Sequence, residues 1–138
     1  MDQSLTVSKY IQSILTESAE ILAIVGNDTH KIFPLLQPDN LSFPFIVHSR
    51  TGISTTYTKD LEIGQLGWYN TVTYTVSCVS DEYDQCVDLA NAVRHSMEGY
   101  RWKTQDIFIH PIQFLGAAEY TTDNDAFVEE LQFQFIVE

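Results

Sequence analysis

The sequence predicts an α+β fold whose elements follow the order α–β–β–α–β–β. Apolar residues recur at three- and four-residue steps in residues 5–25 and again in residues 86–97, which is the period of an amphipathic helix. Residues 68–79 and 127–137 instead alternate apolar and polar side chains, as half-buried strands do. Two hairpins, each preceded by helix, predict one mostly antiparallel four-stranded sheet with the helices packed on one face.

The first helical segment carries a signal for a break near its middle. The sequence Thr16-Glu17-Ser18 interrupts the apolar stripe, and Ser18 is a residue type that caps helix starts. Gly26 and Asn27 then favour the left-handed turn that ends a helix. A short extended piece at residues 30–34 follows.

Two strands are expected in the central part of the chain. Residues 43–48 form a strand with Pro44 at its start, where a missing N–H is tolerated. In residues 71–78, Val, Tyr, Val and Cys alternate with Thr and Ser, which predicts one apolar face and one face lined by hydroxyls. A loop or hairpin tip at residues 59–64 would join the two strands.

The second helix begins after Ser80 with acidic residues in its first turn and stops at Gly99. Cys86 lies on its apolar stripe and Cys78 on the apolar face of the preceding strand. Two cysteines at this spacing match no zinc or redox motif, so we expect both to be buried, unpaired thiols.

Two further strands complete the predicted sheet. Residues 107–114 form one, interrupted by Pro111, which indicates a bulge or an edge position. Residues 127–137 form the last one. No repeat, linker or low-complexity stretch divides the chain, so residues 1–138 are expected to form a single domain.

The chain is acidic, and this excludes some functions. The chain has 7 Lys and Arg against 19 Asp and Glu, which gives a formal net charge of −12. No Lys or Arg follows Lys103. Such a surface repels phosphate, so we expect no sequence-specific nucleic-acid binding through a basic groove. The sequence also has no basic, apolar N-terminal leader and no apolar run of membrane-spanning length, so we expect a soluble protein without a membrane partner.

No arrangement of residues supports catalysis. The four histidines, at positions 30, 48, 95 and 110, have no second ligand at metal-binding spacing. The acidic start of the second helix lacks the glycine and distal glutamate of a calcium loop. Gly64 and Gly67 precede a strand, whereas a phosphate-binding loop precedes a helix. We therefore predict no catalytic, metal or cofactor-binding residues and no cofactor.

The central hairpin instead concentrates large apolar side chains, which protein interfaces use for contact area. An alternative is that these side chains fold back onto their own sheet. A strand edge opened by a proline could supply a second contact surface. The candidate interface residues are Tyr57, Leu61, Ile63, Trp68 and Tyr69 at the hairpin and Pro111 at the edge.

Several short motifs follow one another in order across nearly the whole chain. These are ILAIVG at 21–26, KIFP at 31–34, FPFIV at 43–47, TVTYTV at 71–76, and Tyr83 leading into LANAVR at 89–94. In the order of these motifs the chain resembles the tail completion, or tail terminator, proteins of long-tailed bacteriophages and prophages.

The resemblance implies a structural protein of the virion tail or neck, assembled in the bacterial host cytoplasm. Members of this family form a ring, commonly a hexamer, at the head-proximal end of the tail tube. The ring terminates tail polymerisation and joins the tail to the head. Its partners would be further copies of the chain, the tail tube protein and the head connector proteins, with DNA passing through an acidic lumen.

Two other interpretations remain open at this stage. The chain could be a neck or head-completion protein of the same virion class. From a different class, a small acidic domain could be an inhibitor or immunity-type protein that masks a basic partner, which predicts a monomer with a one-to-one complex.

Overall fold

The computed structural model describes residues 6–27, 31–35, 42–59, 66–104, 107–122 and 125–138, with the backbone alone described at 57–59 and 66–68. Three helices and seven strands form in these ranges. In chain order they are α1 (Val7–Thr16), α2 (Ala19–Val25), β1 (Ile32–Pro34), β2 (Phe45–Lys59), β3 (Leu66–Ser80), α3 (Tyr83–Met97), β4 (Trp102–Lys103), β5 (Phe108–Ile109), β6 (Gln113–Thr121) and β7 (Phe127–Val137).

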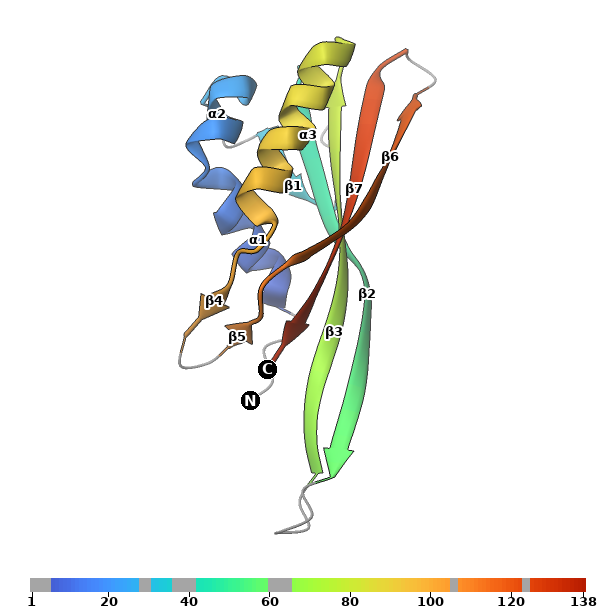
Figure 1. Cartoon of the computed structure of the whole chain (residues 1–138). Helices are drawn as coiled ribbons and strands as arrows, with labels where there is room; N and C mark the ends of the chain where they lie inside the picture. The colour runs from blue at the N-terminus through green and yellow to red at the C-terminus, as the bar shows by residue number, and fades with distance from the viewer. Residues whose placement is uncertain (1–5, 28–30, 36–41, 60–65, 105–106, 123–124) are drawn as a thin grey trace.

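All seven strands belong to one strongly twisted sheet. The strand order is β1-β2-β3-β7-β5-β4, and β6 pairs with another part of the same edge of β7. The helices α1, α2 and α3 lie together on one side of this sheet, while β2 and β3 extend well past them as a long hairpin (Figure 1). The class is α+β.

The expectation of a four-stranded, mostly antiparallel sheet is wrong, because the sheet has seven strands and is mixed. The strand β1 runs parallel to β2, with Ile32 opposite Ile46. The predicted strand at 107–114 is two strands, since the ladder breaks at Pro111 between β5 and β6. The strands β1, β4 and β5 span only two or three residues, too few for an alternating pattern to be read.

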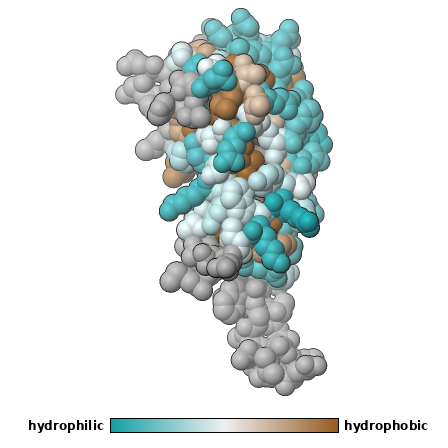
Figure 2. All heavy atoms as spheres, turned by 90° about the vertical axis from the view of Figure 1, so that its left-hand side faces the viewer, coloured by the Kyte–Doolittle hydropathy of each residue, from teal (hydrophilic) through white to brown (hydrophobic). Residues whose placement is uncertain are grey.

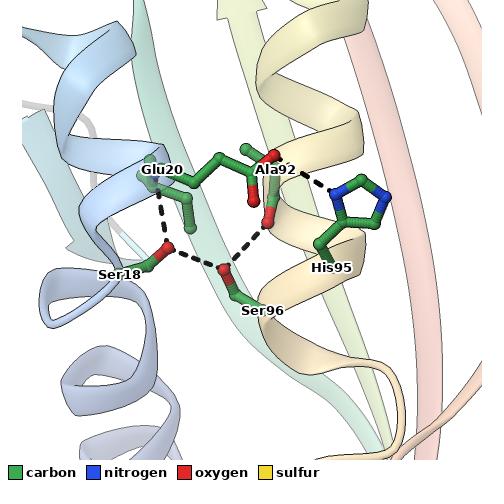
Figure 3. Close-up of polar contacts among 6 residues, drawn as sticks. Ser18, Glu20, Ala92, His95 and Ser96 are labelled. Atoms are coloured by element: carbon green, nitrogen blue, oxygen red, sulfur yellow. Dashed lines mark hydrogen bonds and ion pairs between the residues drawn. The ribbon is translucent and has the colours of Figure 1, made fainter.

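The first helical segment breaks at Ser18, as its sequence predicts. The Ser18 hydroxyl accepts a hydrogen bond from the Ile21 N–H at 3.3 Å and so caps α2. The same hydroxyl meets the Ser96 hydroxyl of α3 at 2.7 Å, and Ser96 donates to the Ala92 carbonyl (Figure 3). The hydroxyl that caps α2 therefore also links α2 to α3. None of the described helices is long and apolar enough to span a membrane.

The main core lies between the helices and the inner face of the sheet. The alternation in β3 places Val72, Tyr74, Val76 and Cys78 in this core, each fully buried. The strand β7 contributes Leu131, Phe133, Phe135 and Val137 from the neighbouring position. Cys86 is buried on α3, and both cysteines are free thiols, as expected.

A buried chain of hydrogen bonds ties α1 to three strands. His48 on β2 is 1% exposed, and its Nδ1 lies 2.6 Å from the Tyr74 hydroxyl of β3. Its Nε2 meets Oε1 of Gln12 on α1, and the Gln12 amide donates to the Ile32 carbonyl of β1 at 2.7 Å. Because an amide oxygen only accepts, the ring must carry its proton on Nε2 and accept from Tyr74 at Nδ1. Every group is satisfied only while the imidazole is neutral.

Burial lowers the pKa of His48 to about 4, compared with an ordinary value of 6.5. The unfolded chain therefore binds this proton more readily than the folded chain between pH 6.5 and 4. The contribution of His48 to the free energy of unfolding therefore has its full value above pH 6.5 and is lost as the pH falls toward 4.

We expect the free energy of unfolding to fall by about 3 kcal/mol over this pH range on account of His48 alone. The substitution His48→Gln should remove that part of the pH dependence, and it should lower stability at pH 7 by about 1–3 kcal/mol through lost hydrogen bonding. Urea unfolding of both proteins from pH 7.5 to 4 measures both effects. His95→Gln is the control, because His95 is 67% exposed on α3. Parallel pH profiles for wild type and His48→Gln would contradict the interpretation.

Candidate interaction surface

The hairpin of β2 and β3 is supported by the rest of the sheet along only part of its length. The two strands pair with each other from Phe45 and Val79 out to Lys59 and Leu66. The strand β3 also pairs with β7, but only from Ser80 as far as Asn70. Beyond Asn70 the hairpin is a two-stranded ribbon that projects from the body of the molecule (Figure 1). Isolated two-stranded ribbons are marginally stable in water, so this ribbon is suited to contact with another molecule.

The structure brings some of the sequence-predicted interface residues together. Tyr57 and Trp68 lie directly opposite each other in the ribbon ladder, and Tyr69 follows at its base. Leu61 and Ile63 lie outside the described residues. Pro111, although distant in sequence, lines the same groove as Tyr69. The hairpin surface and the proline-opened edge are therefore continuous at this groove.

The groove has a volume of about 420 Å³ and lies where the strand beside β7 changes from β5 to β6. Pro111 has no N–H, so the ladder stops there. His110 still donates its N–H to the Ile136 carbonyl at 2.8 Å, whereas the N–H of Ile112 turns away to the Tyr100 carbonyl at 2.9 Å. The lining residues are Tyr69, Thr71, His110, Pro111, Gln113, Gln134, Phe135 and Ile136.

The face of the sheet opposite the helices is polar along the middle of β3 and β7 and apolar at one end, where Phe45, Val79 and Val128 form a small buried cluster with Ala126. On β3 the hydroxyl residues at alternate positions point to this face, and on β7 Gln132 and Gln134 do the same. Hydroxyl groups also link the hairpin strands, since Thr55 donates to Asn70 at 2.6 Å and Thr51 to the Thr73 carbonyl at 3.2 Å. These bonds hold the strands together without apolar packing. The polar part of this face is well suited to contact with water or with polar groups.

In the described part of the chain, two long stretches of strand edge carry no partner strand; the short strands β1 and β4 and the far end of β3 add shorter ones. The outer half of β2 is one, because β1 covers only Ile46, Val47 and His48. The strand β6 is the other, because it pairs with β7 alone. Sequence patterning misses most of β6, since Gly116, Ala117 and Ala118 give no alternation. A signal for the second half of β6 was the absence of Gly, Pro, Asn and Asp from Ala117 to Thr121.

A pair of carboxyl groups faces across the β6–β7 ladder near its turn. Glu119 lies directly opposite Glu129. Burial raises the pKa of Glu129 to about 7, and the hydrogen bond and negative charge of Glu119 add to this. The pKa of Glu119 is lowered by its hydrogen bond with Glu129 and by the Tyr83 hydroxyl, which donates to it at 3.0 Å. Below about pH 7 the two carboxyls thus hold one proton, which limits the repulsion of like charges placed opposite each other.

The other titrating groups that the structure describes include two histidines in surface pairs. In the ranges the structure describes, no group of three or more His, Cys, Asp or Glu could hold a metal ion. His95 pairs with Glu20 at 3.2 Å, and His110 pairs with Glu138 at 2.8 Å, both at the surface. His30 lies outside the described residues. On the helix side, hydrophilic side chains separate small hydrophobic areas (Figure 2).

The fold is shared with a component of a virus-like particle. A chain from the structure of the virion of a native gene transfer agent particle superposes with a TM-score of 0.72 at 18% sequence identity. The alignment covers 93% of this chain and 91% of that chain. No protein-family model and no curated protein sequence matches the chain. At this identity the likeness defines the fold of the chain, and it includes nearly all of both proteins.

The substitution Glu129→Gln should stabilise the protein at high pH. Because the pKa of Glu129 is raised in the folded state, ionising this carboxyl lowers the free energy of unfolding. The loss reaches its full value above pH 7 and is absent below about pH 4.5, where the carboxyl is protonated in both states. Because Glu129 is only partly buried and solvent screens its charge, we expect a gain on the order of 1 kcal/mol at pH 8. The gain should vanish as the pH falls to 4.5.

Thermal or urea unfolding at pH 8 and pH 4.5 tests this. Asp88→Asn removes a negative charge of equal size from an exposed site on α3 and controls for net charge. Equal stabilisation by both variants would mean that the effect comes from the lower net negative charge of the protein, and it would contradict the explanation by the Glu119–Glu129 pair.

Proposed function

We propose that the protein is a structural, non-enzymatic component of a phage or phage-like virion. The observation that carries the proposal is the fold likeness to a chain of the gene transfer agent virion over nearly the full length of both chains. A likeness that included only a hairpin or a helix pair would suggest a common packing unit. One that includes every layer of the domain supports a common architectural role.

Within that class, we propose that the chain forms a ring at the head-proximal end of the tail tube. The resemblance of its motifs to tail completion proteins supports this position. In this role the ring terminates tail polymerisation and joins the tail to the head, in contact with the tail tube protein and the head connector proteins. The site of action is the tail or neck of the virion, after assembly in the host cytoplasm.

The physical features of the chain suit such a ring. A cyclic ring needs two different contact surfaces on each subunit, and the chain has two long open stretches of strand edge in its described part. The projecting ribbon gives one surface long reach. The net charge of −12 disfavours adhesion of DNA to the lumen and lets the polymer slide through it.

Self-association in solution tests the proposal. Six chains of 15.8 kDa would form a ring of about 95 kDa. Because every copy carries the same negative charge, repulsion opposes assembly at low ionic strength. We therefore expect the fraction of rings to increase with protein concentration and with salt from about 0.01 to 0.15 M, as the Debye length shortens.

Mass photometry or sedimentation velocity across a concentration series gives the measurement, with and without purified tail tubes. A closed oligomer in either condition, located at one end of the tubes by electron microscopy, is the expected result. A protein that stays monomeric in both conditions and binds no tube end would contradict the ring.

A further inference from the structure

The two long open strand edges differ in their chemistry, and this difference indicates what each one contacts. An edge strand exposes a row of unpaired backbone N–H and C=O groups, which another strand can extend. Natural edges that must stay free are protected by charges, prolines or bulges along their length. Both edges here contain a bulge, at Thr51 in β2 and at Leu115 in β6, and each bulge lies near one end of the exposed stretch.

Past its bulge, β2 offers a regular edge without protection. The ladder from Gly52 to Lys59 pairs with β3 without a further shift. The residues from 52 to 58 carry no charge and no proline, and Ser, Thr and Ile dominate them. Ile53 is 37% exposed on this edge. The stretch is of a kind that pairs readily with another strand.

Past its bulge, β6 offers a regular edge of six residues, compared with eight for β2. The ladder from Gly116 to Thr121 pairs with β7 in regular register. Gly116, Ala117 and Ala118 have small side chains, so a second backbone can approach the strand closely. They border a shallow hollow of about 220 Å³ together with Leu115, Glu130 and Gln132.

Charge distinguishes the two edges. The strand β2 contains Arg50 and Lys59 and no acidic residue. The strand β6 contains Glu119 and no basic residue, and Glu129 and Glu130 lie beside it on β7. Pairing β2 with β2 or β6 with β6 would bring like charges together, whereas pairing β2 with β6 brings opposite charges together. In a chain of net charge −12, β2 is the exception: its exposed stretch from 52 to 58 is neutral, and a basic residue lies near either end of that stretch.

We propose that the outer half of β2 in one copy of the chain pairs with the β6 edge of a second copy, which extends one sheet into the next. Each copy then uses both edges once, so the contact is heterologous and repeats from copy to copy until it closes. The pairing would also give the projecting ribbon the third strand that it lacks within its own chain. The closed form of this array rests on the proposed ring function, whereas the pairing itself does not.

Cysteine cross-linking between two different variants tests the pairing. Ser54→Cys places a thiol on the exposed β2 edge, and Ala117→Cys or Ala118→Cys places one on β6. The native Cys78 and Cys86 are fully buried and provide a constant background. Under mild oxidation, a mixture of a β2 variant and a β6 variant should form disulfide-linked dimers. Each variant alone should form none beyond the background, because a disulfide requires its two Cα atoms to lie within about 7 Å.

A chain that carries both thiols should give a ladder of linked multimers. The control mixture combines Ser54→Cys with Asn91→Cys, which is exposed on α3, and should remain unlinked. Circular dichroism confirms that each variant is folded. Efficient linkage of Ser54→Cys with itself, or no linkage in the β2–β6 mixtures at concentrations at which the wild type associates, would overturn the proposal. A wild type that stays monomeric without linkage would overturn it as well.

The mass of the wild-type protein separates this inference from the proposed function. A ring without β2–β6 linkage means that the pairing is wrong and the ring stands. Linkage in a particle whose mass is that of a dimer means that the pairing stands and the ring is wrong.

Discussion

The structure depends on the fact that β3 is longer than the body of the domain that supports it. Between Asn70 and Ser80 it is the central strand, bonded to β2 on one side and to β7 on the other. Over this stretch its buried side chains pack against the helices. The hydrogen bonds among His48, Tyr74 and Gln12 also hold α1 against the sheet. Beyond Asn70 the same strand has one neighbour and no helix above it. One strand therefore lies at the centre of the sheet over most of its length and in a two-stranded ribbon at its far end.

The sequence predicted the elements whose signal is local. The strict alternation of β3 and β7 identified both strands, and Ser18 correctly placed the break between α1 and α2. The predicted sheet had too few strands. The missing strands β1, β4 and β5 form through pairing with other strands, and each contains too few residues for an alternating pattern. The strand β6 was shortened because small residues hide its alternation. Its existence follows from the open edge of β7 and not from its own composition.

The candidate surface was predictable only in part for the same reason. Large side chains at Tyr57, Trp68 and Tyr69 pointed to the hairpin from sequence alone. That Tyr69 and Pro111 share a groove depends on where β7 changes neighbours, which no local pattern encodes. The facing carboxyls of Glu119 and Glu129 likewise exist only once the β6–β7 register is known. Residue type indicates what a side chain can do, and strand pairing decides which other side chain it meets.

The junction at Pro111 has a mechanical consequence. Ile112, which directly precedes β6, is joined to the segment that follows α3 by two backbone hydrogen bonds: the Gly99 N–H donates to the Ile112 carbonyl, and the Ile112 N–H donates to the Tyr100 carbonyl. The Arg94 guanidinium also lies over the Phe114 ring at 3.9 Å. A pull along β6 would load its ladder with β7 in shear, so that many bonds resist together, and would transmit the force to α3. A pull across the projecting ribbon would open its bonds one after another. The resistance of the sheet to force therefore depends on direction, because a load along the strands is shared by many hydrogen bonds at once and a load across them is not.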